Sequence, residues 1–94
     1  MRVLGFDWDV VNRAKLLAHE REPEDVEDVF ESGDPLVFEH PRHSGRHMAL
    51  GFAGERFVLV VFEYDVASRW VRVVTAYEPT SSAWWRQYAK AKSK

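Results

Sequence analysis

The spacing of apolar residues changes along the first third of the chain. Residues 3–6 form a short apolar run that predicts a strand. Residues 9–19 then repeat apolar positions at intervals of three and four, which predicts a helix. Asp9 stands where its side chain can cap this helix by accepting from backbone N–H groups that lack a helical partner. The side chains expected to face inward are Val11, Ala14, Leu17 and Ala18.

A second helix is predicted to begin at Pro23, because proline suits the first turn of a helix. Its buried stripe is expected to consist of Val26, Val29 and Phe30. Gly33 is a natural end for this helix, since glycine readily adopts the left-handed conformation that closes helices. The Asp34-Pro35 pair then predicts a turn.

From residue 36 onward the pattern is typical of strands. The predicted strands are residues 36–38, 47–52, 57–64 and 70–77. Residues 57–64 are nearly all apolar, so we expect a central strand that is buried on both faces. Within residues 70–77, Val73 and Thr75 are expected to share one face, and Arg72 is expected on the other.

A last helix is predicted over residues 81–91, with two tryptophans and a tyrosine along one edge. Consecutive strands on tight turns pair antiparallel, and helices on one face of such a sheet give a two-layer domain. The sequence therefore predicts an α+β fold: a small antiparallel β-sheet with two N-terminal helices and a C-terminal helix. We expect a single domain over residues 1–94, with residues 90–94 as a basic tail and a candidate for disorder.

Composition excludes several classes of protein. The chain has 94 residues and no cysteine, so disulfides and thiolate metal sites are excluded. No apolar run approaches the roughly 18 residues of a membrane span. No signal peptide precedes the first strand, so we expect a cytoplasmic protein without a membrane partner.

Charge is distributed unevenly along the chain, although the net formal charge is only −2. Residues 22–34 contain many acids and no base, whereas bases exceed acids from Arg56 onward. Such an asymmetry can focus an anionic ligand onto one face of a protein. A solvated helix face is the alternative interpretation of the acidic stretch.

Several segments, taken in order, carry a resemblance to a known family. They are residues 6–9 with Asn12, Lys15 and His19; residues 25–30 with 34–36; Arg46 with Leu50 and Gly51; residues 56–61; residues 71–76; and Tyr88. Their order and spacing resemble the BrnT-type toxins of bacterial type II toxin–antitoxin pairs, which share a RelE-like ribonuclease fold.

This resemblance implies a RelE/BrnT-like two-layer domain that acts as an endoribonuclease without a metal or another cofactor. It also implies two partners: RNA, and a cognate DNA-binding antitoxin that neutralises the toxin. A homodimer and a toxin–antitoxin hetero-oligomer are the assemblies to expect.

Cleavage of RNA without a metal requires a base for the 2′-hydroxyl, an acid for the leaving oxygen and cations for the charged phosphorane. Histidine exchanges protons near neutral pH, and arginine offers a two-pronged donor to phosphate. The candidate catalytic residues are His19, Arg46, His47, Arg72, Tyr77 and Tyr88. The candidate RNA-binding residues are Lys15, Arg56 and Arg86.

Several of these candidates also have a purely structural interpretation. His19 can be a helix-end residue that the helix dipole favours. Arg46 and His47 can form an exposed junction between a loop and a strand. Arg72 can cover apolar surface with its aliphatic stem, and Tyr88 can belong to the core or to a partner surface.

Two other functions remain open. A catalytically impaired interaction module is suggested by Tyr77, because the family usually has an arginine at that position, and by the paired tryptophans. A metal-dependent enzyme is suggested by the three histidines within residues 40–47, a type of cluster that zinc uses. Arginines are interleaved with those histidines and would repel a cation, so the sequence favours no metal.

Overall fold

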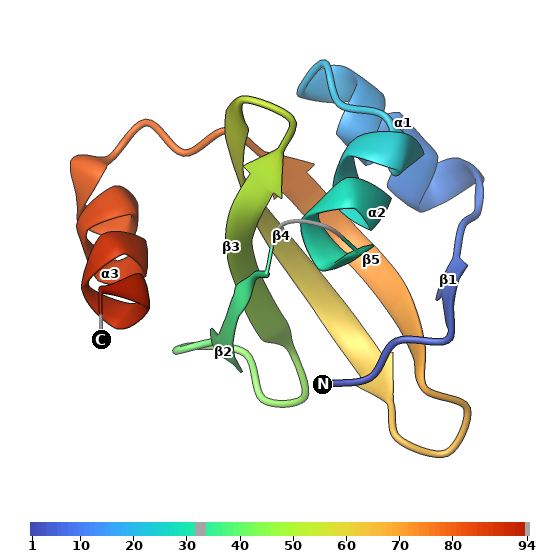
Figure 1. Ribbon diagram of the computed structural model, residues 1–94. Coiled ribbons are helices and arrows are strands. Elements are labelled where there is room, and N and C mark those ends of the chain that lie inside the picture. The colour runs from blue at the N-terminus through green and yellow to red at the C-terminus, as the bar shows by residue number, and fades with distance from the viewer. Residues whose placement is uncertain (32–33, 94) are drawn as a thin grey trace.

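The computed structural model describes residues 1–31 and 34–93, which form three helices and one five-stranded sheet (Figure 1). In chain order the elements are β1 (Gly5–Asp7), α1 (Val10–Ala18), α2 (Pro23–Glu31), β2 (Leu36–Glu39), β3 (His47–Ala53), β4 (Arg56–Asp65), β5 (Trp70–Tyr77) and α3 (Ser82–Lys92). The predicted α+β class is confirmed, as is the order of its elements. Gly33, the expected end of the second helix, lies outside the described residues. None of the described helices combines the length and the apolarity needed to cross a membrane.

The sheet is mixed, so the prediction of an antiparallel sheet is wrong for one strand pair. The strand order is β1-β5-β4-β3-β2, and every neighbouring pair is antiparallel except β1 and β5. Between these two strands the chain passes through both N-terminal helices and three other strands. Because such a long connection lets the chain return in the same direction, β1 can pair in parallel with β5.

Asp9 and Asn12 begin α1 with the predicted cap. The Asp9 carboxylate accepts a hydrogen bond from the Asn12 backbone N–H at 2.9 Å, and the Asn12 side chain accepts one from the Asp9 N–H at 2.8 Å. The side-chain amide of Asn12 also donates to the Asp7 carbonyl at 2.8 Å. This bond ties the first turn of α1 to the end of β1.

The inward face predicted for α1 is wrong. The buried residues of the helix are Asn12 and Leu16, one turn apart. The residues predicted to be buried are all exposed: Val11, Ala14, Leu17 and Ala18. The bond from Asn12 to the end of β1 determines which side of the helix meets the sheet, and the more numerous apolar residues lie on the other side.

The two faces of the sheet carry separate apolar clusters, each covered by a different helix. The face that we call the α2 face consists of Ala49, Ala53, Val58, Val60, Phe62, Val71, Val73 and Ala76. The face that we call the α3 face consists of Met48, Leu50, Leu59 and Val61. On the first of these faces α2 buries Val26 and Val29, as predicted, and on the second α3 places Trp84 and Tyr88.

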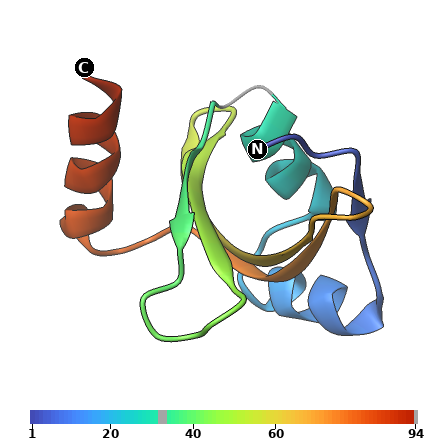
Figure 2. The same cartoon turned by 90° about the horizontal axis from the view of Figure 1, so that it is seen from below.

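The prediction of two layers is therefore wrong. Figure 2 shows the sheet curved around α2, with α3 outside the curve. The reason lies in β4, whose residues 58–62 are all buried, as predicted for a central strand. A strand with apolar side chains on both sides needs cover on both faces of its sheet. Helix α3 supplies that cover on the side opposite α2.

An irregularity in β5 changes which side chains face which helix. Phe62 pairs with Val73, whereas its neighbour Val61 pairs with Thr75, so β5 carries one extra residue between the two pairs. Thr75 therefore shares the α3 face with Val61. The prediction that Thr75 lies on the same face as Val73 assumed strict alternation, which the bulge interrupts.

Helix α3 also extends further than the predicted disordered tail allows. It runs to Lys92, and the backbone N–H of Ser93 donates to the Ala89 carbonyl at 3.0 Å to close it. The Lys92 ammonium lies 3.0 Å from an Asp34 carboxylate oxygen, just before β2. Within the described part of the chain, residues 90–93 thus belong to the folded domain.

Candidate functional site

Three of the predicted cations line one shallow hollow of about 140 Å³. Lys15 comes from α1, Arg46 directly precedes β3, and Arg72 comes from β5. The hollow lies where α1 packs against β5 (Figure 1), and Arg46 reaches it from the far side of β4. A hollow of this volume is below the usual range for drug-sized ligands, so it suits a small group such as a single phosphate.

Arg72 is held by the carboxylates at the end of β1. Its Nη1 donates a short hydrogen bond to Asp9 Oδ2, and the same nitrogen lies 3.8 Å from Asp7 Oδ2. The hydrogen bond to Asp9 raises the pKa of the Arg72 guanidinium above its usual value. The pKa of Asp9 is lowered, first by the backbone hydrogen bond from Asn12 and then by Arg72. Both groups are therefore charged at neutral pH.

Glu63 places a further negative charge between the two arginines. It lies directly opposite Arg72 in the pairing of β4 with β5, and its Oε2 is 3.9 Å from Arg46 Nε. Lys15, in contrast, has no ion pair within the described part of the chain. Lys15 is thus the cation of the hollow whose charge the protein neutralises least.

The loop before β3 positions Arg46 through the side chain of His40. The Nδ1 atom of His40 accepts from the backbone N–H groups of Arg42 at 3.1 Å and His43 at 3.2 Å. The His40 N–H donates to the Arg46 carbonyl at 2.9 Å, which closes the loop. Burial, followed by the positive charges of His43, Arg46 and Arg42, lowers the pKa of His40. His40 is thus an uncharged acceptor at neutral pH.

The histidines of residues 40–47 do not converge on one point. His47 stacks on Phe62, on the α2 face, with ring centroids 5.6 Å apart. His47 therefore does not line the hollow that Arg46 and Arg72 share, although all three were predicted to be catalytic. Among the described residues, no group of three or more His, Asp or Glu side chains is arranged to hold a metal ion.

His19 and Tyr77 form a second pair of candidate residues that the structure brings together. His19 closes the C-terminal end of α1, and Tyr77 is the last residue of β5. Their ring centroids lie 5.5 Å apart. Lys15, which lines the hollow, precedes His19 by about one helical turn. The His19–Tyr77 pair therefore lies about 6 Å from Lys15 along the axis of α1.

The remaining candidates lie elsewhere. Arg56 is 3.8 Å from Glu78, which is also 3.9 Å from the buried guanidinium of Arg21. Arg86 donates to Ser82 of its own helix at 2.8 Å. Tyr88 contacts the rings of Phe52, Phe57 and Trp85 in an aromatic cluster that docks α3. None of these three predicted residues lines the hollow.

Glu63 was not predicted from the sequence as part of the site, and Asp9 was predicted only as the helix cap. Glu63 becomes a neighbour of Arg72 through strand register, which the bulge in β5 makes difficult to predict. Asp9 comes close to Arg72 because β1 pairs in parallel with β5, whereas the sequence predicted an antiparallel sheet. The role of Asp9 as a partner of Arg72 therefore had no clear signal in the sequence.

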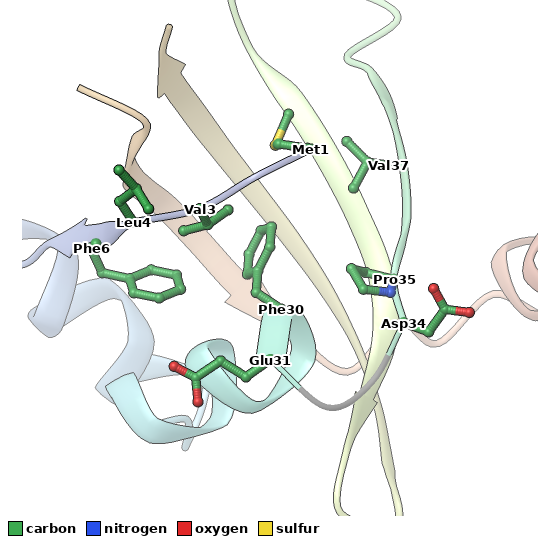
Figure 3. A pocket seen from close by; sticks show the side chains of 10 residues that line it. Met1, Val3, Leu4, Phe6, Phe30, Glu31, Asp34, Pro35 and Val37 are labelled. Atoms are coloured by element: carbon green, nitrogen blue, oxygen red, sulfur yellow. The ribbon is translucent and has the colours of Figure 1, made fainter. Parts of the chain in front are cut away.

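A larger hollow, of about 620 Å³, lies apart from these residues. Its lining comes from the segment around β1, the end of α2 and the start of β2 (Figure 3). The rings of Phe6 and Phe30 meet there edge to face, with centroids 5.7 Å apart. None of the predicted catalytic or RNA-binding residues contributes to this lining.

Comparison with known proteins adds no assignment. The chain matches no family model, and it has no significant match among curated proteins. The basis for a functional proposal is therefore the geometry of the hollow and of the His19–Tyr77 pair.

Proposed function

We propose that the chain binds RNA at the hollow lined by Lys15, Arg46 and Arg72, and that it is the toxin of a type II toxin–antitoxin pair, as its resemblance to BrnT-type toxins implies. The observation that carries the proposal is the convergence of three cations, from three separate elements, on one phosphate-sized hollow. Arginine and lysine in such a place attract the RNA backbone. The proposed protein partner is a DNA-binding antitoxin that neutralises the chain.

His19 and Tyr77 are the groups proposed to move protons. In the reaction, O2′ of a ribose attacks the adjacent phosphorus, the O2′–P bond forms and the P–O5′ bond breaks. His19 takes the proton of the 2′-hydroxyl, and the Tyr77 phenol gives a proton to O5′. The nearby cations stabilise the charge that develops on the phosphorane. The products are a 2′,3′-cyclic phosphate and a 5′-hydroxyl.

The test is cleavage of a labelled single-stranded RNA by the purified chain, with analysis of the product ends. We expect 2′,3′-cyclic phosphate ends, and a loss of cleavage in the His19→Gln and Tyr77→Phe variants. Lys15→Ala should weaken binding of the uncleaved RNA. Arg86→Ala, a change on the exposed side of α3, is the matched control and should behave as the unchanged chain. Intact RNA after incubation with the unchanged chain, together with normal growth of cells that express it, would remove the proposal of cleavage.

A second candidate function is an interaction module of the same fold that does not cleave RNA. The carboxylates around Arg72 favour it, because Asp7, Asp9 and Glu63 offset the cations of the hollow. This candidate predicts that Arg46→Ala and Tyr77→Phe have no effect in any RNA-binding or RNA-cleavage assay. The chain should still form a stable complex with a protein partner. A loss of RNA cleavage in either variant would contradict it.

A further inference from the structure

Helix α1 turns its apolar side toward solvent. Val10 is 83% exposed, Leu17 is 73% exposed and Val11 is 60% exposed. Ala14 and Ala18 are exposed as well. With 100° between successive residues, these five side chains occupy one continuous side of the helix, opposite the buried Asn12 and Leu16. We call this side the outer stripe.

No packing contact among the described residues explains why the apolar side chains of the outer stripe face solvent. Surface helices normally place their apolar side against the core and their polar side in water. In α1 the inner side is anchored by Asn12 and one leucine, and nothing in the described part of the chain covers the opposite side. A continuous apolar stripe on an exposed helix is a feature of surfaces that bind a partner.

The charges beside the outer stripe indicate the chemistry of that partner. Arg13 borders one margin of the stripe and Lys15 borders the other, and α1 contains no acidic residue. Neither cation forms an ion pair within the described part of the chain. A second copy that packed on α1 through its own α1 would bring these cations close to their equivalents, and like charges at an interface disfavour that arrangement.

We propose that the outer stripe docks an amphipathic helix of another protein, with an apolar stripe of its own and acidic residues along both margins. The apolar side chains would meet Val10, Ala14 and Leu17, and the carboxylates would pair with Arg13 and Lys15. The docked length is about 14 Å, which corresponds to nine residues of helix. The outer stripe borders the hollow through Val11 and Lys15. Docking of a helix does not require RNA cleavage, so the proposal stands whether or not the chain is a nuclease.

The test is selection from a displayed library of helical peptides against the full chain. The library fixes an apolar stripe and randomises each margin position among Glu, Gln and Lys. We expect the selected peptides to carry Glu at the margins. Leu17→Gln should weaken their binding about tenfold, since it removes the burial of one leucine. Val66→Gln is the matched control, because Val66 is 79% exposed in the loop between β4 and β5.

A charge reversal separates the proposed recognition from general adhesion. Arg13→Glu should weaken the binding of peptides with Glu at the margins. It should strengthen the binding of peptides that carry Lys at the margin facing residue 13. The proposal is overturned if no peptide is enriched, if the enriched margins are not acidic, or if Leu17→Gln leaves binding unchanged. Sedimentation of the chain alone supplies the last check. A dimer that Leu17→Gln dissociates would show that a second copy occupies the stripe, and would also overturn the proposal.

Discussion

Arg72 on β5 donates to the carboxylate of Asp9, and Asp9 simultaneously caps α1. One oxygen of Asp9 accepts the Asn12 backbone N–H, while the other accepts Arg72 Nη1. A single carboxylate thus joins the start of the helix to the strand that carries Arg72, one of the three cations of the hollow. The position of Arg72 consequently depends on the cap of α1.

Substitutions at Asp9 should separate these two roles. Asn caps helices as well as Asp does, so Asp9→Asn removes only the charge that faces Arg72. Asp9→Ala removes the cap as well and should destabilise the domain more. Asp7→Asn should have the smallest effect, because Asp7 lies 3.8 Å from Arg72 and does not cap the helix. Urea unfolding measures this order, and equal midpoints for Asp9→Ala and Asp7→Asn would contradict it.

The Asp9 carboxylate should also make stability depend on pH in acid. Its pKa in the folded protein lies below the ordinary value of 3.8. Between these two values the unfolded chain binds a proton that the folded protein does not, so the free energy of unfolding decreases as the pH falls through this window. The stabilisation is complete at pH values well above 3.8. The difference in urea midpoint between the unchanged chain and Asp9→Asn, followed from pH 6 to pH 2, should therefore shrink at the acid end.

His40 should produce a second pH dependence closer to neutrality. Its pKa lies below the ordinary value of 6.5, because protonation is opposed by burial and by the positive neighbours of its ring. The unfolded chain therefore takes up this proton first as the pH falls below 6.5, and stability decreases. His40→Asn keeps a side-chain acceptor for the loop without a titrating group and should flatten this part of the profile. An unchanged slope between pH 7 and pH 5 in that variant would contradict the assignment.

The neighbours Leu16 and Leu17 provide a direct test of the orientation of α1. Leu16 is buried, so Leu16→Ala should cost about 2–5 kcal/mol of unfolding free energy through lost contacts and a cavity. Leu17 is 73% exposed, so Leu17→Ala should change stability by no more than about 0.5 kcal/mol. The apolar spacing in the sequence predicts the reverse order. Urea unfolding of the two variants decides between the two orientations of the helix.

The same pair shows what the sequence can and cannot predict here. Apolar periodicity locates every helix and strand, and it identifies Val26 and Val29 as the buried residues of α2. In α1 it fails, because the side-chain bond from Asn12 to the Asp7 carbonyl is a tertiary contact that periodicity does not contain. The spacing of apolar residues indicates which of them share one side of a helix. It does not indicate which side of the helix faces the sheet.

The candidate site was predicted in part for a related reason. The residue types suited to phosphate could be identified in the sequence, and three of them meet in the hollow. Their convergence depends on the parallel pairing of β1 with β5 and on the bulge beside Phe62, neither of which leaves a clear local signal. His47 illustrates the consequence: adjacent residues in a strand point to opposite faces, so its position next to Arg46 separates it from that side chain.

Lys15 lies at the margin of the outer stripe and also lines the hollow, so a docked acidic helix and RNA should compete for it. We expect a saturating Glu-margined peptide to weaken RNA binding by the chain, and RNA to weaken peptide binding by the same factor, because such coupling is reciprocal. Lys15→Gln should remove the competition and reduce the salt slope of RNA binding by about 1, as expected when one phosphate contact is lost. Arg46→Ala is the matched control, since it should weaken RNA binding and leave peptide binding intact.

Fluorescence titrations of labelled RNA with and without the peptide measure the coupling. Equal RNA affinities in both titrations would show that Lys15 does not link the two surfaces, even if each surface binds its own ligand.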